Sequence, residues 1–155
     1  MNAREKILQL QSVSPLVLPS LLLCDFGDLR SEVELLGKAG IQALHLDVMD
    51  GLFVPNMTYG MPIVEGLARH TELPLDVHLM IQEPSRYLEQ FGAAGANLIT
   101  VHVEACSDLS ATLKQIRDLG IASGVALNPD TELDAILPCL ELCDLSLIHI
   151  SEPTR

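Results

Sequence analysis

The sequence predicts an α/β fold in which parallel strands alternate with helices and close into a barrel. Short apolar segments typical of strands recur at intervals of roughly 20 to 30 residues, with helical patterns between them. A glycine stands between a helical pattern and the next strand at Gly40, Gly95 and Gly120. The near-continuously apolar strands fit a sheet that is covered on both sides. Polar residues gather where successive strands end, which favours a barrel with its active site at that edge.

The strands and helices can be assigned in order from their apolar patterns. The predicted strands are 16–20, 41–48, 74–80, 97–102, 123–127 and 145–150. The predicted helices between them are 28–39, 61–69, 84 to about 91–93, 108–119 and 134–140. The last helix is the weakest, because Pro138 interrupts its pattern.

Two of these helices carry recognisable ends and faces. Asp28 is a plausible N-cap of the first helix, and Gly40 follows its last residue. Pro84 suits the first turn of the third helix. The apolar faces predicted to point inward are Leu29, Val33 and Leu36 in the first helix, and Tyr87, Leu88 and Phe91 in the third.

Composition limits the classes of partner. The chain has 155 residues, 48% of them hydrophobic, and a formal net charge of −12. This length suits one domain with a sizeable core. The negative charge argues against a nucleic-acid or anionic-membrane partner, because a negative field repels both. It does not forbid an anionic small molecule, since backbone amides bind phosphate locally.

Cysteine spacing and apolar runs indicate the compartment. Cys24, Cys106, Cys139 and Cys143 show no C-x-x-C spacing, which favours reduced thiols. No apolar run approaches the roughly 18 residues of a membrane span. Residues 1–11 lack the apolar region of a signal peptide. We therefore expect a soluble, cytoplasmic protein.

The strongest functional signal lies at the end of the second predicted strand. His45 and Asp47 are two residues apart, so on a strand they share a face. An imidazole beside a carboxylate is half of a site for a divalent metal. Such a pair is often structural instead, so this segment alone leaves both interpretations open.

The third predicted strand repeats the arrangement. Asp76, His78 and Met80 share a face just before a turn. Two neighbouring strands that end in this way would present His45, Asp47 and His78 as three ligands of one divalent metal, with positions left for substrate. Histidine with carboxylate suits Zn, Fe, Mn or Co, and the residues do not choose among them.

Other polar residues near strand ends have weaker assignments. His102 and Glu104 are again two apart, but three ligands are already supplied, so a supporting role beside the metal is favoured. Asp50 is interpreted as a turn residue or a supporting group beside the metal rather than a base, and Asn56 is expected to fix the loop by bonding to backbone. Ser20 ends the first strand, where a serine usually serves turn chemistry.

Met49 and Met80 continue the polar faces of the second and third strands. They are predicted to line the roof of the pocket, and ordinary packing of a flexible apolar side chain explains them nearly as well.

Several segments resemble those of the ribulose-phosphate 3-epimerase family, in order and at the family's spacing. They are Leu18–Leu22, His45–Gly51, Val54–Asn56, Asp76–Met80 and Ala93–Ala96. The H-x-D-V-M-D-G and D-V-H-L-M motifs are the specific part of the match, which runs over about residues 16–144. The resemblance implies a (β/α)8 TIM barrel of the ribulose-phosphate binding type and a homo-oligomeric parent protein.

The resemblance also implies an activity and roles for individual residues. The expected reaction is epimerisation at C3 of D-ribulose 5-phosphate to D-xylulose 5-phosphate, through an enediolate, in the pentose phosphate pathway. One divalent metal ion would be held by His45, Asp47 and His78. Asp47 would accept the substrate proton, and Ser20 and His78 would contact the phosphorylated ketopentose. A family histidine also corresponds to His102.

The end of the sequence departs from the family's pattern. The family places a second catalytic aspartate on a seventh strand and a Gly-rich phosphate loop after the sixth, whereas residues 151–155 contain no glycine. We therefore expect three parts: an N-terminal extension (1–15), about six of eight barrel strands (16–144), and a non-native tail (145–155) in which His149 has no role. The fragment itself is expected to have little activity.

Two alternatives stay open at this point. A related barrel enzyme could share these motifs: an epimerase of a six-carbon ketose phosphate such as allulose 6-phosphate, or a metal-dependent decarboxylase or aldolase. The other alternative is a non-catalytic barrel fragment that only pairs with other barrel pieces.

Overall fold

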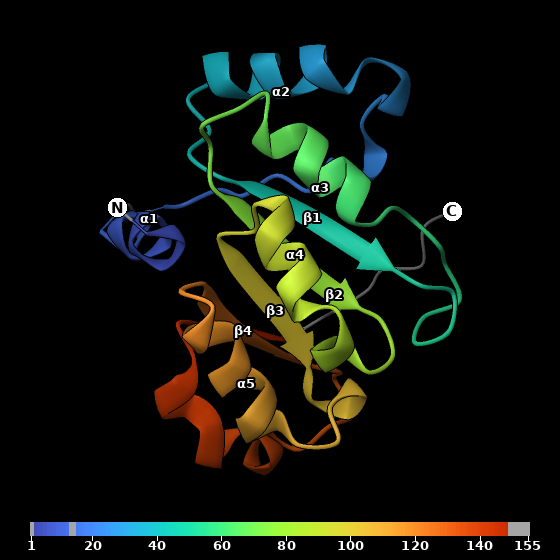
Figure 1. The fold of residues 1–155 in the computed structure, drawn as a ribbon, viewed down its shortest axis with the longest axis vertical. Coiled ribbons are helices and arrows are strands. Elements are labelled where there is room, and N and C mark those ends of the chain that lie inside the picture. Colours follow the sequence, from blue (N-terminus) through green and yellow to red (C-terminus); the bar gives the residue numbers. More distant parts are fainter. Residues whose placement is uncertain (1, 13–14, 149–155) are drawn as a thin grey trace.

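A computed structural model of the chain describes residues 2–12 and 15–148, and shows an α/β fold (Figure 1). Five parallel strands form one sheet in the order β1-β2-β3-β4-β5. The strands are β1 (Leu44–Met49), β2 (Leu75–Met80), β3 (Leu98–His102), β4 (Ala122–Leu127) and β5 (Leu145–Ile148). Each strand pairs with its sequence neighbour, as expected when helical crossovers join parallel strands. The predicted parallel α/β architecture is therefore confirmed.

Four helices alternate with the strands along the chain, the first of them before β1. They are α2 (Leu29–Lys38), α3 (Met61–Ala68), α4 (Leu88–Ala94) and α5 (Leu109–Asp118). In Figure 1, α3, α4 and α5 lie across the sheet, and α2 lies beyond α3 at one edge. Their apolar faces pack on the outward side chains of the strands, so Val64 and Leu67 of α3 and Phe91 of α4 are buried in one core with Leu46 and Val77. None of the described helices combines the length and apolar character of a membrane span.

The first predicted strand, 16–20, is wrong. Its only sheet-like contact among the described residues is an isolated bridge between Ser20 and His45. The His45 N–H donates to the Pro19 carbonyl at 3.0 Å. Because Pro19 has no N–H, this segment cannot continue a regular ladder. It still brings Ser20 beside β1.

One predicted helix start is confirmed in position, and another needs correction. Asp28 occupies the N-cap position of α2 without a side-chain cap hydrogen bond, and Asp25 instead accepts from the Gly27 N–H at 2.8 Å. The helix predicted from Pro84 begins as a separate 3₁₀ turn, Pro84–Arg86, and α4 starts only at Leu88. Tyr87 lies between them and is 39% exposed, so it does not point inward as predicted.

The last predicted helix, 134–140, is not an α-helix. Two 3₁₀ segments, Leu133–Ala135 and Leu137–Leu142, replace it. Pro138 lies at the start of the second segment, and its missing N–H prevents a continuous α-helical ladder. The sixth predicted strand forms as β5, while His149 and the rest of the predicted tail lie outside the described residues.

The N-terminal segment contains a helix that the sequence reasoning missed. Helix α1 (Ala3–Leu10) begins with a capping box in which Asn2 accepts from the Glu5 N–H and Glu5 accepts from the Asn2 N–H. Ile7 packs against Leu98 and Ala122, the first residues of β3 and β4. Helix α1 therefore covers the amino-terminal ends of these strands.

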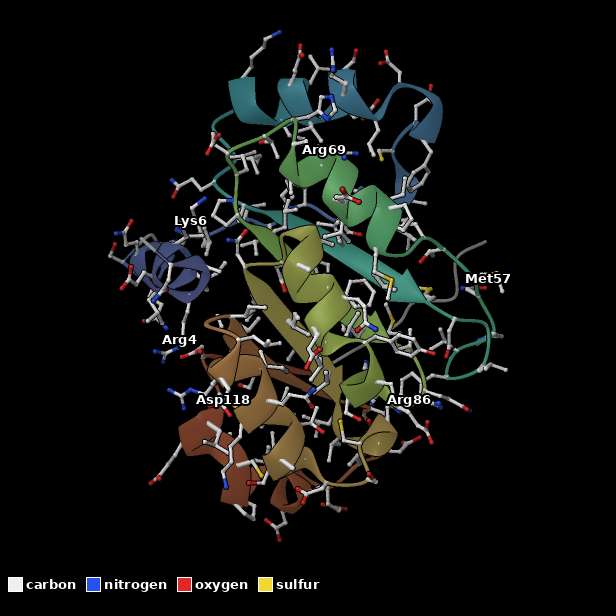
Figure 2. All side chains as sticks on the ribbon, in the orientation of Figure 1. Arg4, Lys6, Met57, Arg69, Arg86 and Asp118 are labelled. Carbon is white, nitrogen blue, oxygen red and sulfur yellow. The ribbon has the colours of Figure 1, made fainter. Side chains whose placement is uncertain are left out.

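The two ends of the sheet carry different side chains. Figure 2 shows Arg4 and Lys6 on α1 at one side of the molecule, and Met57 and Arg86 at the opposite side, where β1 and β2 end. Arg4 forms a bidentate ion pair with Asp144 (Nε–Oδ2 2.9 Å, Nη2–Oδ1 2.6 Å), just before β5. This pair ties the first helix to the last described strand.

We predict that Gly95→Ala destabilises the fold by roughly 2–5 kcal/mol. Gly95 ends α4 with φ of +110°, which costs other residues about 1–2 kcal/mol. An added Cβ would also lie 2.5 Å from the Ala68 Cβ, and overpacking costs a further 1–3 kcal/mol or so. The control is Gly37→Ala, in open space within α2, which should stabilise by about 0.5–1 kcal/mol. Equal urea midpoints for the two variants would contradict this account.

A second prediction concerns acid sensitivity. Burial alone would raise the pKa of Asp144, but hydrogen bonds from Arg4 and the Ser123 N–H outweigh it and lower the pKa below its ordinary 3.8. A carboxylate with a lowered pKa stabilises the fold above about pH 4 and loses this effect as pH falls through the lowered value. Asp144→Asn should cost about 1 kcal/mol at pH 7, and the difference should shrink towards pH 2. Urea titrations at several pH values measure it, and parallel stability curves would count against it.

Candidate metal and substrate site

The pairing of β1 with β2 places the predicted site residues beside one another. In this parallel register Asp47 lies opposite His78, and His45 lies opposite Asp76. The four side chains share one face of the sheet, because residues two apart on a strand point the same way. They lie close to the carboxyl ends of both strands, which end at Met49 and Met80.

The three predicted ligands come together around one point. His45 Nε2 lies 3.2 Å from Asp47 Oδ1, and His78 Nδ1 lies 3.1 Å from the same oxygen. One ligand atom of each residue lies within 4.8 Å of the other two. Bonds of about 2.0–2.2 Å to one cation place its ligand atoms at comparable separations. Two imidazoles and a carboxylate therefore form a donor set that fits a divalent metal ion.

Burial and hydrogen bonding set the charges in this cluster. Burial alone would lower the pKa of His45, but its hydrogen bonds to Asp47 and Asp76 outweigh this and raise the pKa to about 10. Burial would likewise raise the pKa of Asp47. Hydrogen bonds from His45, His78 and Ser20 instead lower that pKa below its ordinary value, so Asp47 is ionised at neutral pH.

Asp76 is a functional candidate that the sequence reasoning did not select. Its Oδ2 lies 2.6 Å from His45 Nδ1, on the side of the ring away from Asp47. A carboxylate that accepts from Nδ1–H leaves Nε2 as the nitrogen that can bind a metal. Asp76 is 2% exposed, and its Oδ1 has no hydrogen-bond partner within the described part of the chain. Asp76 can be recognised only from the register of β1 against β2, which sets it opposite His45. The spacing of residues within one strand does not show this.

Ser20 reaches the same cluster from the segment before β1. Its hydroxyl donates to Asp47 Oδ2 at 2.5 Å, while its Oγ accepts from the Leu22 N–H at 3.2 Å. Ser20 thus takes part both in the turn and in the cluster. Its predicted role in turn chemistry is therefore compatible with its predicted contact with substrate.

His102, at the end of β3, extends the cluster away from Asp47. Its Nε2 lies 2.9 Å from His78 Nε2, and its Nδ1 lies 3.3 Å from Glu104 Oε2. His102 is completely buried, and the ring of Phe53 packs on it with centroids 4.9 Å apart. The structure thus places His102 behind His78.

The loop after β1 is held mainly by Asp50. Its carboxylate accepts from the N–H groups of Leu52, Phe53 and Gln82, at 2.8–2.9 Å, which also ties this loop to the one after β2. The turn role predicted for Asp50 agrees with these contacts. The Asn56 backbone carbonyl accepts from the Gly51 N–H at 2.9 Å and its side chain lines the cavity described below, so the expected contact of this side chain with backbone stays a prediction.

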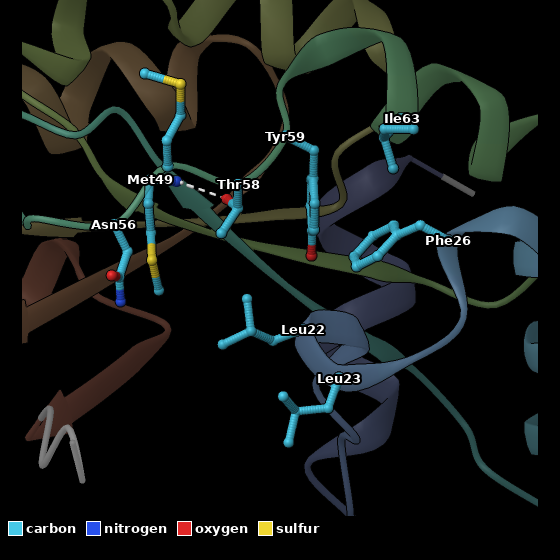
Figure 3. A pocket seen from close by; sticks show the side chains of 9 residues that line it. Leu22, Leu23, Phe26, Met49, Asn56, Thr58, Tyr59 and Ile63 are labelled. Atoms are coloured by element: carbon cyan, nitrogen blue, oxygen red, sulfur yellow. Dashed lines mark hydrogen bonds between the residues drawn. The ribbon is translucent and has the colours of Figure 1, made fainter. Parts of the chain in front are cut away.

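Two cavities lie at the carboxyl end of β1, and His45, Asp47 and His78 are not among the residues that line them. The first, of about 690 Å³, is bounded mainly by apolar side chains and is shown in Figure 3. It is lined by Leu22, Leu23, Phe26, Met49, Asn56, Met57, Thr58, Tyr59 and Ile63. The second, of about 530 Å³, shares Met49 and Tyr59 with it. Met49 lines both cavities, whereas Met80 is fully buried and lines neither, and the roles of both at a substrate pocket stay predictions.

Thr58 links the first cavity to the cluster. Its hydroxyl donates to the Asp47 carbonyl at 2.7 Å and accepts from the Met49 N–H at 3.0 Å, the dashed line in Figure 3. Tyr59 stands next to Phe26 there, with ring centroids 5.4 Å apart. Burial and the charge of Asp47 raise the pKa of Tyr59, so its phenol stays protonated at neutral pH. The cavity thus lies against the backbone of the strand that carries Asp47.

Comparison with known proteins matches most of the chain to one family. The sequence profile of the ribulose-phosphate 3 epimerase family matches residues 16–155. A ribulose-phosphate 3-epimerase of Bacillus subtilis is 46% identical over 137 residues, which cover 88% of this chain and 63% of that protein. Its counterpart from Synechocystis is 49% identical over 139 residues, covering 88% and 60%. The chain thus spans about three-fifths of the length of these relatives.

Solved structures with similar folds have very different sequences. A tryptophan synthase subunit alpha from Legionella pneumophila superposes with a TM-score of 0.62 at 13% identity, covering 96% of this chain and 68% of that one. A Yersinia pestis DHPS superposes with a TM-score of 0.58 at 14% identity, covering 83% and 54%. At such identities the likeness concerns the fold alone, which is that of β/α-barrel enzymes.

The sequence motifs, the register of β1 and β2, and the comparison with known proteins all point to the same family. The H-x-D-V-M-D-G and D-V-H-L-M segments lie on β1 and β2 at the candidate metal site, within the residues that the family profile matches. The chain therefore belongs to the ribulose-phosphate 3-epimerase family.

Proposed function

We propose that the protein to which this chain belongs epimerises D-ribulose 5-phosphate and D-xylulose 5-phosphate at C3. The observation that carries this proposal is the convergence of His45, Asp47 and His78 on one point at the strand ends. Family membership supports the reaction, because the relatives that match are named ribulose-phosphate 3-epimerase. A phosphorylated ketopentose is the substrate.

The metal ligands in this proposal are His45 through Nε2, His78 through Nδ1, and a carboxylate oxygen of Asp47. These are the atoms that face one another in the cluster. A divalent cation held there supplies Lewis acidity, which stabilises negative charge on a substrate oxygen. Zn, Fe, Mn and Co all suit two imidazoles and a carboxylate, so metal identity is a matter for measurement.

Asp47 is the proton acceptor in this proposal. Asp47 is ionised, so it can accept a proton from a substrate carbon. It is only 7% exposed, so few water molecules reach its carboxylate. Once the proton is removed, the carbon becomes planar, and return of a proton to its other face gives the epimer. Ser20 donates to Asp47 Oδ2 and thereby orients the carboxylate, and its position also suits contact with a sugar hydroxyl.

Metal binding by the chain is the first test. We expect His78→Ala to weaken Co²⁺ binding at least about 100-fold, because even loss of an outer partner of a metal ligand costs about 10- to 100-fold. The control is His70→Ala, since His70 is an exposed histidine on a different part of the surface. Isothermal titration calorimetry measures both. Equal affinities of the two variants would remove His78 from the site.

Proton abstraction is the second test, made on the intact gene product. Asp47→Asn should lower kcat by roughly 10²- to 10⁴-fold, the usual contribution of a positioned general base. It should also stop uptake of solvent deuterium at C3 of D-ribulose 5-phosphate in D₂O, followed by ¹H NMR.

The matched control is Asp118→Asn, which removes the same charge from an exposed position at the end of α5. If Asp47→Asn still exchanges the C3 proton at the rate of this control, another group is the base. If the intact protein carries out no epimerisation with any of the four metals, the proposed reaction is wrong.

A further inference from the structure

One side of β1 has no neighbouring strand within the described residues, because β1 is first in the order of the sheet. Backbone N–H and carbonyl groups on that side need partners from elsewhere, since an unpaired buried backbone group is costly. Near the start of the strand, the His45 N–H donates to the Pro19 carbonyl at 3.0 Å. Near its end, the groups that need partners belong to Asp47 and Met49.

Thr58 supplies these partners. Its hydroxyl donates to the Asp47 carbonyl at 2.7 Å and accepts from the Met49 N–H at 3.0 Å. Its own N–H donates to the Met49 carbonyl at 3.2 Å. Figure 3 shows Thr58 beside Met49, with the bond to the Met49 N–H drawn as a dashed line. One residue thus takes the place of a neighbouring strand at the end of β1.

The loop after β1 folds back on itself and brings Thr58 to this position. Asp50 and Met57 form an isolated antiparallel bridge, and the Gly51 N–H donates to the Asn56 carbonyl at 2.9 Å. Gly51 has φ of +74°, a conformation that favours glycine. A closed turn therefore sets the position of Thr58 relative to the strand.

The two bonds of the Thr58 hydroxyl hold the main chain from which the Asp47 carboxylate projects. They fix the two consecutive peptide groups that follow Asp47. The carboxylate itself is oriented by its contacts with His45, His78 and Ser20. Those contacts set its rotation, whereas Thr58 sets the position of the chain that carries it. Misplacement of a reacting group by about 1 Å can lower a rate about 100-fold.

We propose that Thr58 is a positioning residue that acts through the main chain of Asp47 to hold the Asp47 carboxylate at the cation and the substrate carbon. The inference rests on the proposed function for the role of Asp47, and it adds a role for Thr58. A hydroxyl is donor and acceptor at once, so it can make both bonds. Valine has nearly the same shape and makes neither, which leaves the Asp47 carbonyl and the Met49 N–H without these partners.

Three variants separate the hydroxyl from the shape of the side chain. Thr58→Val removes the hydroxyl, and Thr58→Ser keeps it. Thr112→Val is the matched control: the Thr112 hydroxyl donates to the Asp108 carbonyl at 2.8 Å, and Thr112 is buried on α5. A general loss of stability would affect both valine variants alike. If Thr58→Val does not fold, Thr58→Ala removes the same hydroxyl and needs less space.

The first measurement uses the intact gene product at saturating Co²⁺. Thr58→Val should lower kcat, and deuterium uptake at C3 of D-ribulose 5-phosphate, about 10- to 100-fold. KM should stay nearly unchanged, because the loss falls on the transition state. Thr58→Ser should recover most of both rates, and Thr112→Val should keep the wild-type values.

The second measurement uses the 155-residue chain. Without metal, the Met49 amide should exchange slowly with D₂O in the wild type and in Thr58→Ser, and much faster in Thr58→Val, as followed by ¹H–¹⁵N spectra. Co²⁺ affinity should fall about 10-fold in Thr58→Val alone, as for loss of an outer partner of a metal ligand.

The outcomes separate this inference from the proposed function. The inference is overturned if Thr58→Val keeps the wild-type rates and Co²⁺ affinity, if Thr58→Ser loses as much as Thr58→Val, or if Thr112→Val loses as much. A wild-type chain that does not bind Co²⁺, or an intact protein without epimerase activity, would overturn the proposed function instead. The Met49 amide still tests the role of Thr58 in that case, because its fast exchange in the wild type would contradict the inference.

Discussion

The parallel register between β1 and β2 is the constraint on which the site depends. It sets Asp47 opposite His78 and His45 opposite Asp76, all on one face of the sheet. A shift of either strand by one residue would turn its polar side chains to the opposite face, into the core of Leu46, Val77 and the helices. The apolar residues that alternate with the polar ones therefore hold the ligands in place. The same packing that stabilises the sheet also aligns the donor atoms.

Much of this arrangement could be predicted from the sequence. Period-two spacing put His45 with Asp47, and Asp76 with His78, and the repeated glycine stops located the strands. Contacts between strands could not be predicted in the same way, because the pattern of residues within a segment does not show how neighbouring strands align with each other. For this reason the bond between Asp76 and His45 was missed, and so was the contact between His78 and His102.

The wrong predictions of the fold have local causes. Residues 16–20 were predicted as a strand from apolar content alone, although Pro19 prevents a ladder, and residues 134–140 as a helix despite Pro138. Helix α1 was missed because its few apolar residues look unremarkable before packing, although Asn2 and Glu5 form a capping box. Its contact with β3 and β4 and the ion pair to Asp144 depend on residues about 90 to 140 positions away, beyond the reach of a local pattern.

The central claim is that His45, Asp47 and His78 share one cation. It is tested most directly by anomalous X-ray diffraction from crystals of the chain grown with Co²⁺ or Zn²⁺. The account predicts one strong anomalous peak within about 2.0–2.2 Å of His45 Nε2, His78 Nδ1 and an Asp47 oxygen. A metal-loaded crystal with no peak among these atoms, or with the metal bound elsewhere, would contradict it.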